Sequence, residues 1–246
     1  MNDALYEMIF KRKSFHLFRG TGDLSLSDGE LAAIRTAWSG FTPLDPSIRT
    51  AIRIAPCLGP RGAEYCILFY SEKKDGYLQN IGYLGEQMDL YLVSENIGTL
   101  WLGLGKPDEA TFDGLDYVIM IAIRKLADGS LFRKDMFKSK RDPVEKIWQG
   151  ERIDGVTELV RFAPSACNSQ PWFVKNDGAL SVFRRFGKLG IMPKNTALYF
   201  NRIDMGIFLA FLDLCLKHRG IAFRRELFCD GGDAQPLTLN AVYHLL

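Results

Sequence analysis

Two long segments of the chain carry apolar residues at the three- and four-residue spacing of an α-helix. They read I-G-Y-L-G-E-Q-M-D-L-Y-L-V-S-E-N-I-G at 81–98 and I-D-M-G-I-F-L-A-F-L-D-L-C-L-K-H-R-G at 203–220. Each ends in a glycine where a helix is expected to stop, and each is followed by a short apolar or aromatic stretch. Residues 205–216 are the most apolar of the chain, but they are too few to span a bilayer and include Asp213. The pattern therefore predicts two helices buried in a protein core.

The two segments belong to a longer internal repeat. Leu90 aligns with Leu212 and Gly98 with Gly220, each pair 122 positions apart. Strand-like stretches flank the two helices in the same order, at 64–70 and 115–123 around the first and at 179–186 and 237–245 around the second. Chance similarity between two α+β segments is the alternative explanation, but the recurring order of elements favours a repeat.

A repeat of this kind predicts an α+β fold with two halves, 1–135 and 136–246. Each half would expose one apolar long helix, and packing the two helices together buries both, as in a homodimer interface. We therefore expect an intramolecular pseudo-dimer joined near 133–150, where no Pro/Gly/Ser-rich linker occurs. Such a chain is expected to act as a monomer.

The composition narrows the class of protein. The hydrophobic content of 47% and the charged content of 24% are ordinary for a globular protein, and the net charge of +2 gives no broad field for nucleic acid or a membrane. Five cysteines without a C-x-x-C pattern disfavour a disulfide framework and a zinc site, and no secretory signal is visible at the N-terminus. We expect a cytoplasmic protein with no bound metal and no nucleic-acid or membrane partner.

Three short stretches carry candidate binding chemistry. R-K-S-F-H-L-F at 12–18 gathers two cations, a hydroxyl and an imidazole, which suits a phosphate, although surface basic clusters are common. F-A-P-S-A-C-N-S-Q-P-W-F at 162–173 concentrates turn formers with two amides and a cysteine. N-I-G-T-L-W-L-G at 96–103 places glycines after the first long helix, either to let a flat ligand approach the backbone or simply to end the helix.

Together these stretches resemble the nitroreductase family of flavoproteins. P-S-A-C-N-S-Q-P-W is similar to the family's signature turn P-S-x-x-N-x-Q-P-W, and N-I-G-T-L-W-L-G is similar to its G-L-G-T-x-W-I-G segment. R-K-S-F-H lines up with the family's R-R-S-x-R opening, with His16 in place of the usual Arg or Lys. The resemblance implies a nitroreductase-like α+β fold, closest to the fused two-repeat branch of the family.

The resemblance also implies a site for flavin mononucleotide (FMN). Its first part would come from the first half of the chain, and the signature turn of the second half would complete it, because family dimers bind FMN between subunits. A basic segment in F-K-S-K-R-D-P at 137–143 would add cations to the phosphate, with Arg141 as a rival of the two lysines. The implied binding residues are Arg12, Lys13, Ser14, His16, Leu102, Gly103, Lys138, Lys140, Pro164, Ser165, Ala166, Asn168 and Gln170.

The reciprocal site is expected to be lost, since Ser47 stands where the second half has Asn168, and A-F-R-R-E at 222–226 replaces the glycine segment. The resemblance implies an FMN-dependent reductase that uses NADH or NADPH and reduces a small-molecule acceptor such as a nitroaromatic or a quinone. No catalytic side chain is required, because the flavin carries the chemistry. Cys167 is interpreted as a packing residue rather than a nucleophile. The alternative function is a flavin carrier or regulatory module without turnover.

Overall fold

The structure, a computed structural model, describes residues 2–57, 62–188, 190–230, 232–233 and 235–246. The chain divides into two compact units. The first comprises 3–73 and 84–137, and the second comprises Asn2, 74–83 and 138–246. Each unit has its own five-stranded sheet. The predicted division near residue 135 and the pseudo-dimer stay predictions.

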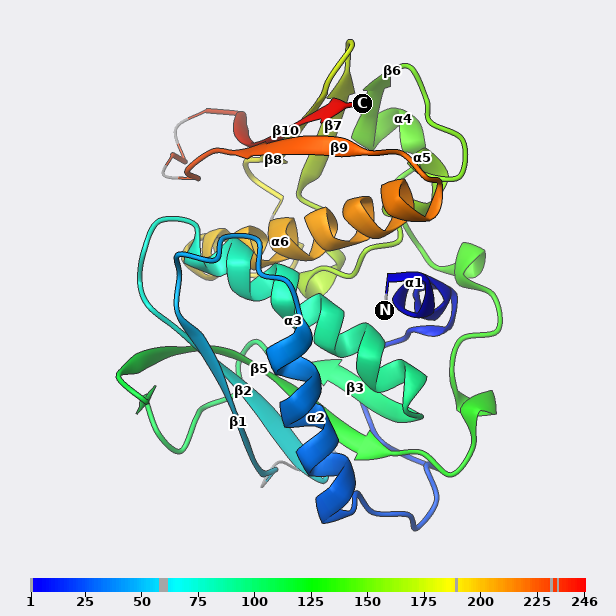
Figure 1. Cartoon of the computed structure of the whole chain (residues 1–246), viewed down its shortest axis with the longest axis vertical. Helices are drawn as coiled ribbons and strands as arrows, with labels where there is room; N and C mark the ends of the chain where they lie inside the picture. The colour runs from blue at the N-terminus through cyan, green and yellow to red at the C-terminus, as the bar shows by residue number, and fades with distance from the viewer. Residues whose placement is uncertain (1, 58–61, 189, 231, 234) are drawn as a thin grey trace. The chain divides into compact units, whose positions relative to one another are not determined.

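The first unit contains an N-terminal helix, a second helix, most of a long helix and five strands (Figure 1). In chain order these elements are α1 (Asn2–Lys11), α2 (Asp28–Gly40), β1 (Thr50–Pro56), β2 (Tyr65–Ser71), α3 (Tyr77–Ser94), β3 (Ile97–Trp101), β4 (Thr111–Phe112), β5 (Leu115–Lys125) and the 3-10 turns η1 (Gly129–Leu131) and η2 (Met136–Lys138). Three pieces of these elements belong to the second unit: Asn2 of α1, the first seven residues of α3, and Lys138 of η2.

The second unit combines short helices with five strands and the longest helix of the chain. Its elements are α4 (Val144–Ile147), β6 (Trp148–Gly150), α5 (Thr157–Val160), η3 (Ala166–Asn168), β7 (Trp172–Asn176), β8 (Leu180–Arg185), α6 (Lys194–His218), β9 (Phe223–Leu227) and β10 (Leu237–Leu245). The predicted helix over 205–216 is confirmed as the centre of α6, and all of these residues are buried.

The two sheets have the same strand order when their strands are taken in chain order. The first sheet runs β1-β2-β5-β3, and the second runs β7-β8-β10-β9 with β6 added beside β7. All pairs are antiparallel except β6 with β7. In both sheets the long helix follows the second strand, and the strand after that helix takes the far edge of this four-strand path. The chain is thus an α+β protein, as the sequence predicts.

Alternation along β2 directs neighbouring side chains to opposite faces of the first sheet. Phe69 faces Trp38 of α2, with ring centroids 5.6 Å apart, and Trp101 of β3, at 6.1 Å. Tyr70 and Leu68 join a second cluster with Phe15, so the segment that follows α1 covers the other face. Both faces of the sheet are therefore buried.

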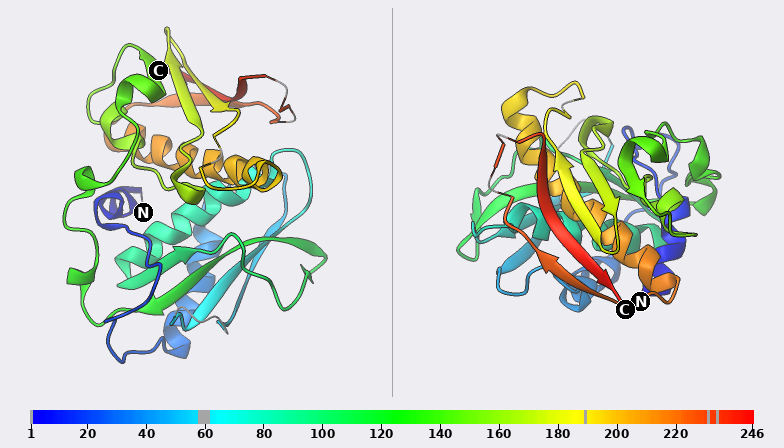
Figure 2. Two further views of the ribbon diagram at one scale, coloured as in Figure 1. Left: turned by 180° about the vertical axis from the view of Figure 1, so that it is seen from behind. Right: turned by 90° about the horizontal axis from the view of Figure 1, so that it is seen from above.

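In the second unit α6 lies against one face of the sheet, as Figure 2 shows from above. Trp172 of β7 is fully buried and stacks on Phe208 of α6, with ring centroids 5.0 Å apart. The first turns of α3 cross α6 in the same unit, where Gly82 and Gly206 bring the two backbones together. A Cβ on Gly82 would overlap the carbonyl of Ile203, and a Cβ on Gly206 would overlap that of Gln79.

This crossing corrects the predicted alignment of the two long helices. The contact is reciprocal, because Gly82 and Gly206 are 124 positions apart, as are Gln79 and Ile203. The helix ends agree with this offset: α3 ends at Ser94 and Asn96 takes a left-handed φ of 57°, while Gly220, 124 positions later, has φ 69° after α6. The expectation that Gly98 ends the first helix is wrong. Gly98 lies in β3, and the offset of 122 is two residues too short for the helices.

None of the helices in the described part of the chain is both long and apolar enough to cross a membrane. Asp204 and Asp213 interrupt the apolar sequence of α6. Both carboxylates are buried and hydrogen-bonded within the protein.

Gly206→Ala is expected to lower the free energy of unfolding by at least about 1–3 kcal/mol, because the added methyl group has no space at the crossing. Gly29→Ala is the matched control, since its added Cβ would lie 4.0 Å from the nearest heavy atom, Ser27 Oγ. The control should leave stability unchanged or raise it by up to about 1 kcal/mol through helix propensity. Denaturant unfolding measures both changes, and equal effects would contradict the described crossing.

Candidate functional site

The N-terminal basic motif lies alongside the glycine segment in the first unit. Helix α1 ends at Lys11, Ser14 forms a parallel bridge with Thr99 of β3, and the Phe15 N–H donates to the Thr99 carbonyl at 2.9 Å. Phe15 itself is buried, whereas His16 is exposed. Two of the predicted motif segments, far apart in the sequence, are thereby brought together.

Arg12 is held by a carboxylate that sequence reasoning missed. Its side chain is only 3% exposed, and its Nε donates to Asp89 Oδ2 at 2.8 Å, while its Nη2 donates to Ser14 Oγ at 3.4 Å. Asp89 also accepts from Thr99 Oγ1 at 2.6 Å and from Trp101 Nε1 at 2.9 Å. Burial opposes the charged form of Arg12, but the Asp89 and Glu86 carboxyl groups raise the pKa of Arg12 above its ordinary value. The charge of Arg12 is therefore compensated inside the protein.

Glu86 lies one turn before Asp89 on α3 and is fully buried. Burial, reinforced by the neighbouring Asp89 charge, raises the pKa of Glu86 well above its ordinary value, although Arg12 acts in the opposite direction. The nearest approach of Arg12 Nε to Glu86 Oε1 is 3.8 Å, against 2.8 Å to Asp89. Asp89 is thus the nearer ion-pair partner of Arg12, and Glu86 is the carboxyl group whose ionisation the fold opposes. Two acidic residues inside the apolar stretch 81–93 were the available sequence signal.

Leu102 and Gly103 follow β3 as expected. The Leu102 N–H donates to the Met120 carbonyl at 2.9 Å, and the Leu102 carbonyl accepts from the Gly105 N–H at 3.0 Å. Both backbone polar groups of Leu102 are therefore hydrogen-bonded, one to the sheet and one within a tight turn. Gly103 is exposed beyond the strand end.

The signature turn of the second unit holds a strained backbone conformation. Cys167, Asn168 and Gln170 have φ values of 49°, 54° and 49°, in the left-handed region that favours glycine. Ser165 Oγ accepts from the Gln170 N–H at 3.0 Å, so Ser165 holds the turn through a nearby backbone group. Such strain persists where surrounding contacts fix it, and it is frequent at binding sites.

Asp204 of α6 accepts two hydrogen bonds from this turn. Its Oδ1 accepts from the Ala166 N–H at 2.9 Å, and its Oδ2 accepts from Ser169 Oγ at 3.2 Å. Burial raises the pKa of Asp204 to about 7, even though both hydrogen bonds act to lower it. Sequence reasoning missed this residue. An aspartate within the apolar helix was the signal.

The amides of the turn bind the basic segment that precedes α4. Asn168 Oδ1 accepts from Arg141 Nη1 at 2.8 Å, and its Nδ2 donates to the Lys140 carbonyl at 3.2 Å. Gln170 is only 5% exposed, and its Oε1 accepts from the Asp142 N–H at 2.7 Å. The resemblance groups this segment with the motifs of the first half, whereas here Arg141 and the main chain of Lys140 and Asp142 contact the turn. The side chains of Lys138 and Lys140 are exposed.

The predicted residues thus form two sets, one in each unit. Each set lies within its own unit, and Pro164 is buried at the start of the turn. The first set is Arg12, Lys13, Ser14, His16, Leu102 and Gly103, and the second is Lys138, Lys140, Pro164, Ser165, Ala166, Asn168 and Gln170. A single site built from both sets stays a prediction.

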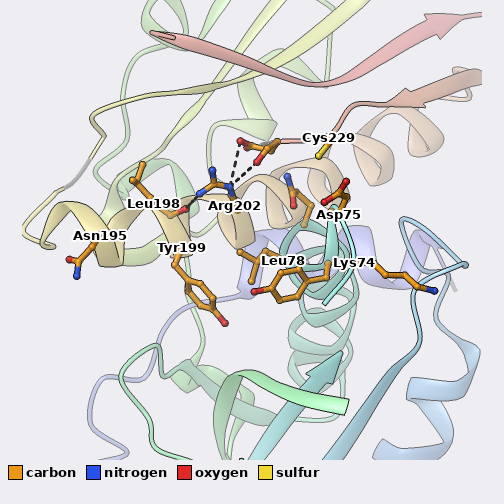
Figure 3. Close-up of a pocket in the computed structure, with 12 residues that line it drawn as sticks. Lys74, Asp75, Leu78, Asn195, Leu198, Tyr199, Arg202 and Cys229 are labelled. Carbon is orange, nitrogen blue, oxygen red and sulfur yellow. Dashed lines mark hydrogen bonds and ion pairs between the residues drawn. The ribbon is translucent and has the colours of Figure 1, made fainter. Parts of the chain in front are cut away.

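The second unit also contains a cavity of about 320 Å³ that none of the predicted residues lines (Figure 3). Tyr199 and Arg202 of α6, Asp75 before α3 and Cys229 after β9 contribute to its walls. Arg202 donates to the Leu198 and Asp230 carbonyls at 2.9 and 3.0 Å and pairs with the Asp233 carboxylate. The guanidinium of Arg202 is therefore already hydrogen-bonded to other groups of the protein.

Comparisons with known proteins agree with the fold. The model of the family described as "Putative TM nitroreductase" matches residues 4–215. The crystal structure of a "putative nitroreductase" from Thermotoga maritima is similar over 98% of this chain and 92% of that one, with a TM-score of 0.63 and 19% sequence identity. No curated protein matches the chain.

Glu86→Gln is expected to raise stability in a pH-dependent way. The unfolded carboxyl ionises near its ordinary pKa of about 4.3, whereas the folded one resists ionisation, so Glu86 destabilises the protein increasingly as pH rises above that value. The variant should match the wild type near pH 4 and exceed it at pH 7 in the free energy of unfolding. Glu7→Gln, at an exposed position of α1, is the control. A Glu86→Gln effect independent of pH would show that Glu86 is ionised in the folded protein.

Proposed function

The chain belongs to the nitroreductase family whose model it matches, and on this premise we propose that it is an FMN-dependent NAD(P)H oxidoreductase. Its substrate would be a small electron acceptor such as a nitroaromatic or a quinone. FMN, when bound, would supply the chemistry, taking a hydride from NADH or NADPH at N5 and passing it to the acceptor in a second half-reaction.

The observation that carries this proposal is the junction of the basic motif with the glycine segment. Because Ser14 and Phe15 are bonded to Thr99, cations and a hydroxyl lie beside β3. A phosphate needs such donors, and a flavin ring needs an accessible backbone such as that of Gly103. The donor set therefore fits a flavin nucleotide.

We assign each set a part in holding the cofactor. Lys13, Ser14 and His16 would bind the phosphate, with Arg12 contributing through Ser14 Oγ. Leu102 and Gly103 would border the ring, and the strained turn would present the Asn168 amide to it. Lys138 and Lys140 would add positive charge. The turn's further members are Pro164, Ser165, Ala166 and Gln170.

The matching strand orders support an intramolecular pseudo-dimer with a single site per monomeric chain. In the second unit Asp213 stands 124 positions after Asp89. It accepts from Arg225 Nη1 at 2.6 Å, and Arg225 stands 124 positions after Trp101. The indole that follows the first long helix is thus replaced by a guanidinium after the second. This difference in residue type supports the loss of the reciprocal site.

Purified protein is expected to be yellow from bound FMN, and anaerobic NADH or NADPH should bleach its visible absorbance band. Reoxidation by a quinone or a nitroaromatic would then complete the cycle. Heat-denatured protein with the same free FMN is the control for non-enzymatic reduction. Protein that binds FMN but stays yellow with both nicotinamides would instead be a flavin carrier, and protein that binds no flavin would contradict the proposal.

Asn168→Ala is expected to weaken FMN binding about tenfold, as removal of a polar partner at about 1–1.5 kcal/mol implies. Ser47→Ala should have no effect, because Ser47 occupies the corresponding place in the lost reciprocal site. Equilibrium dialysis gives both affinities and the stoichiometry, expected to be one FMN per chain. Equal losses in the two variants, or two FMN per chain, would contradict the one-site arrangement.

A further inference from the structure

Arg133, which the family resemblance does not include, lies beside the N-terminal basic motif in the first unit. Its N–H donates to the carbonyl of Lys11, the last residue of α1, at 2.9 Å. The preceding residue, Phe132, packs edge-on against Phe15, with ring centroids 5.8 Å apart. A backbone bond and a ring contact therefore hold Arg133 next to Lys13.

The charges of Lys13 and Arg133 are not compensated by the protein. Partial burial and the neighbouring Arg133 lower the pKa of Lys13, and burial and the neighbouring Arg12 lower that of Arg133. Among the described residues no carboxylate forms an ion pair with either side chain, whereas Arg12 is paired with Asp89. Lys13 instead places its Nζ 4.6 Å from the centroid of the Phe15 ring.

We propose that Lys13 and Arg133 form the binding site for a phosphate monoester, the phosphate of the flavin nucleotide, and that Arg12 is a buried framework residue beside it. This inference rests on the proposed function for the identity of the ligand. It keeps Lys13 from the motif, adds Arg133, and gives Arg12 a structural part instead of direct contact with the phosphate.

Electrostatics favours this pair over Arg12. Two like charges held together raise the free energy of the empty site, and a phosphate that contacts both relieves this repulsion as it forms charge-assisted hydrogen bonds. A phosphate near Arg12 would have to compete for the guanidinium with Asp89, because Arg12 Nε–H already donates to the Asp89 carboxylate. Binding should therefore depend on the Arg133 charge and on the phosphate of the ligand.

The test compares FMN with riboflavin, which lacks the phosphate, for the wild type, Arg133→Gln and Lys134→Gln. Lys134 is the adjacent, exposed residue, so its variant loses the same charge without touching the site. Arg133→Gln should weaken FMN binding by about tenfold to a hundredfold, the range expected for a charge-assisted hydrogen bond. Its riboflavin affinity should stay within about threefold of the wild type, and Lys134→Gln should bind both flavins normally.

Unchanged FMN affinity in Arg133→Gln, or equal losses of FMN and riboflavin, would overturn the assignment. If the wild type binds neither flavin, the proposed function fails, and inorganic phosphate then tests the site separately. Phosphate should raise the Tm of the wild type above that in chloride of equal ionic strength, with no such rise in Arg133→Gln. A rise in both proteins, or in neither, would also overturn the assignment.

Discussion

The first unit depends on one buried carboxylate. Asp89 accepts hydrogen bonds from Arg12, Thr99 and Trp101, and so joins the end of α1, the strand β3 and the helix α3 that carries it. Removing one partner from a buried charge pair typically costs about 3–5 kcal/mol, because the other charge is left without a counterion. The position of the basic motif relative to the glycine segment follows from this interaction.

The pairing of the Arg12 charge with Asp89 changes the role that the motif gives to Arg12. A motif records residue types, but the electrostatic role of each cation depends on the carboxylates that the fold places beside it. Arg12 and Lys13 are neighbours in the sequence, yet Arg12 is buried against Asp89 while Lys13 lies with Arg133. Adjacent cations of one motif can therefore serve structure and binding separately.

Much of the fold could be predicted from the sequence, because helical periodicity and strand-like stretches are local signals. The buried centre of α6 and the strands β5 and β10 are confirmed almost to the residue. The predicted alignment of the two long helices was wrong by two residues, because the left-handed residue that follows α3 is Asn96 and not a glycine. Asp89, Asp204 and Arg133 were missed because their roles arise from contacts between distant segments, which no local pattern records.

Three residues of the signature turn, Cys167, Asn168 and Gln170, adopt left-handed φ values at a cost in folding free energy. Non-glycine residues in that region cost on the order of 1 kcal/mol each, least for asparagine. Glycine at the exposed Cys167 would remove most of that cost there, whereas the buried Gln170 side chain also accepts a hydrogen bond from the Asp142 N–H. The second unit instead keeps a conformationally expensive loop, so a gain in thermostability from this turn would also change the backbone that positions the Asn168 amide.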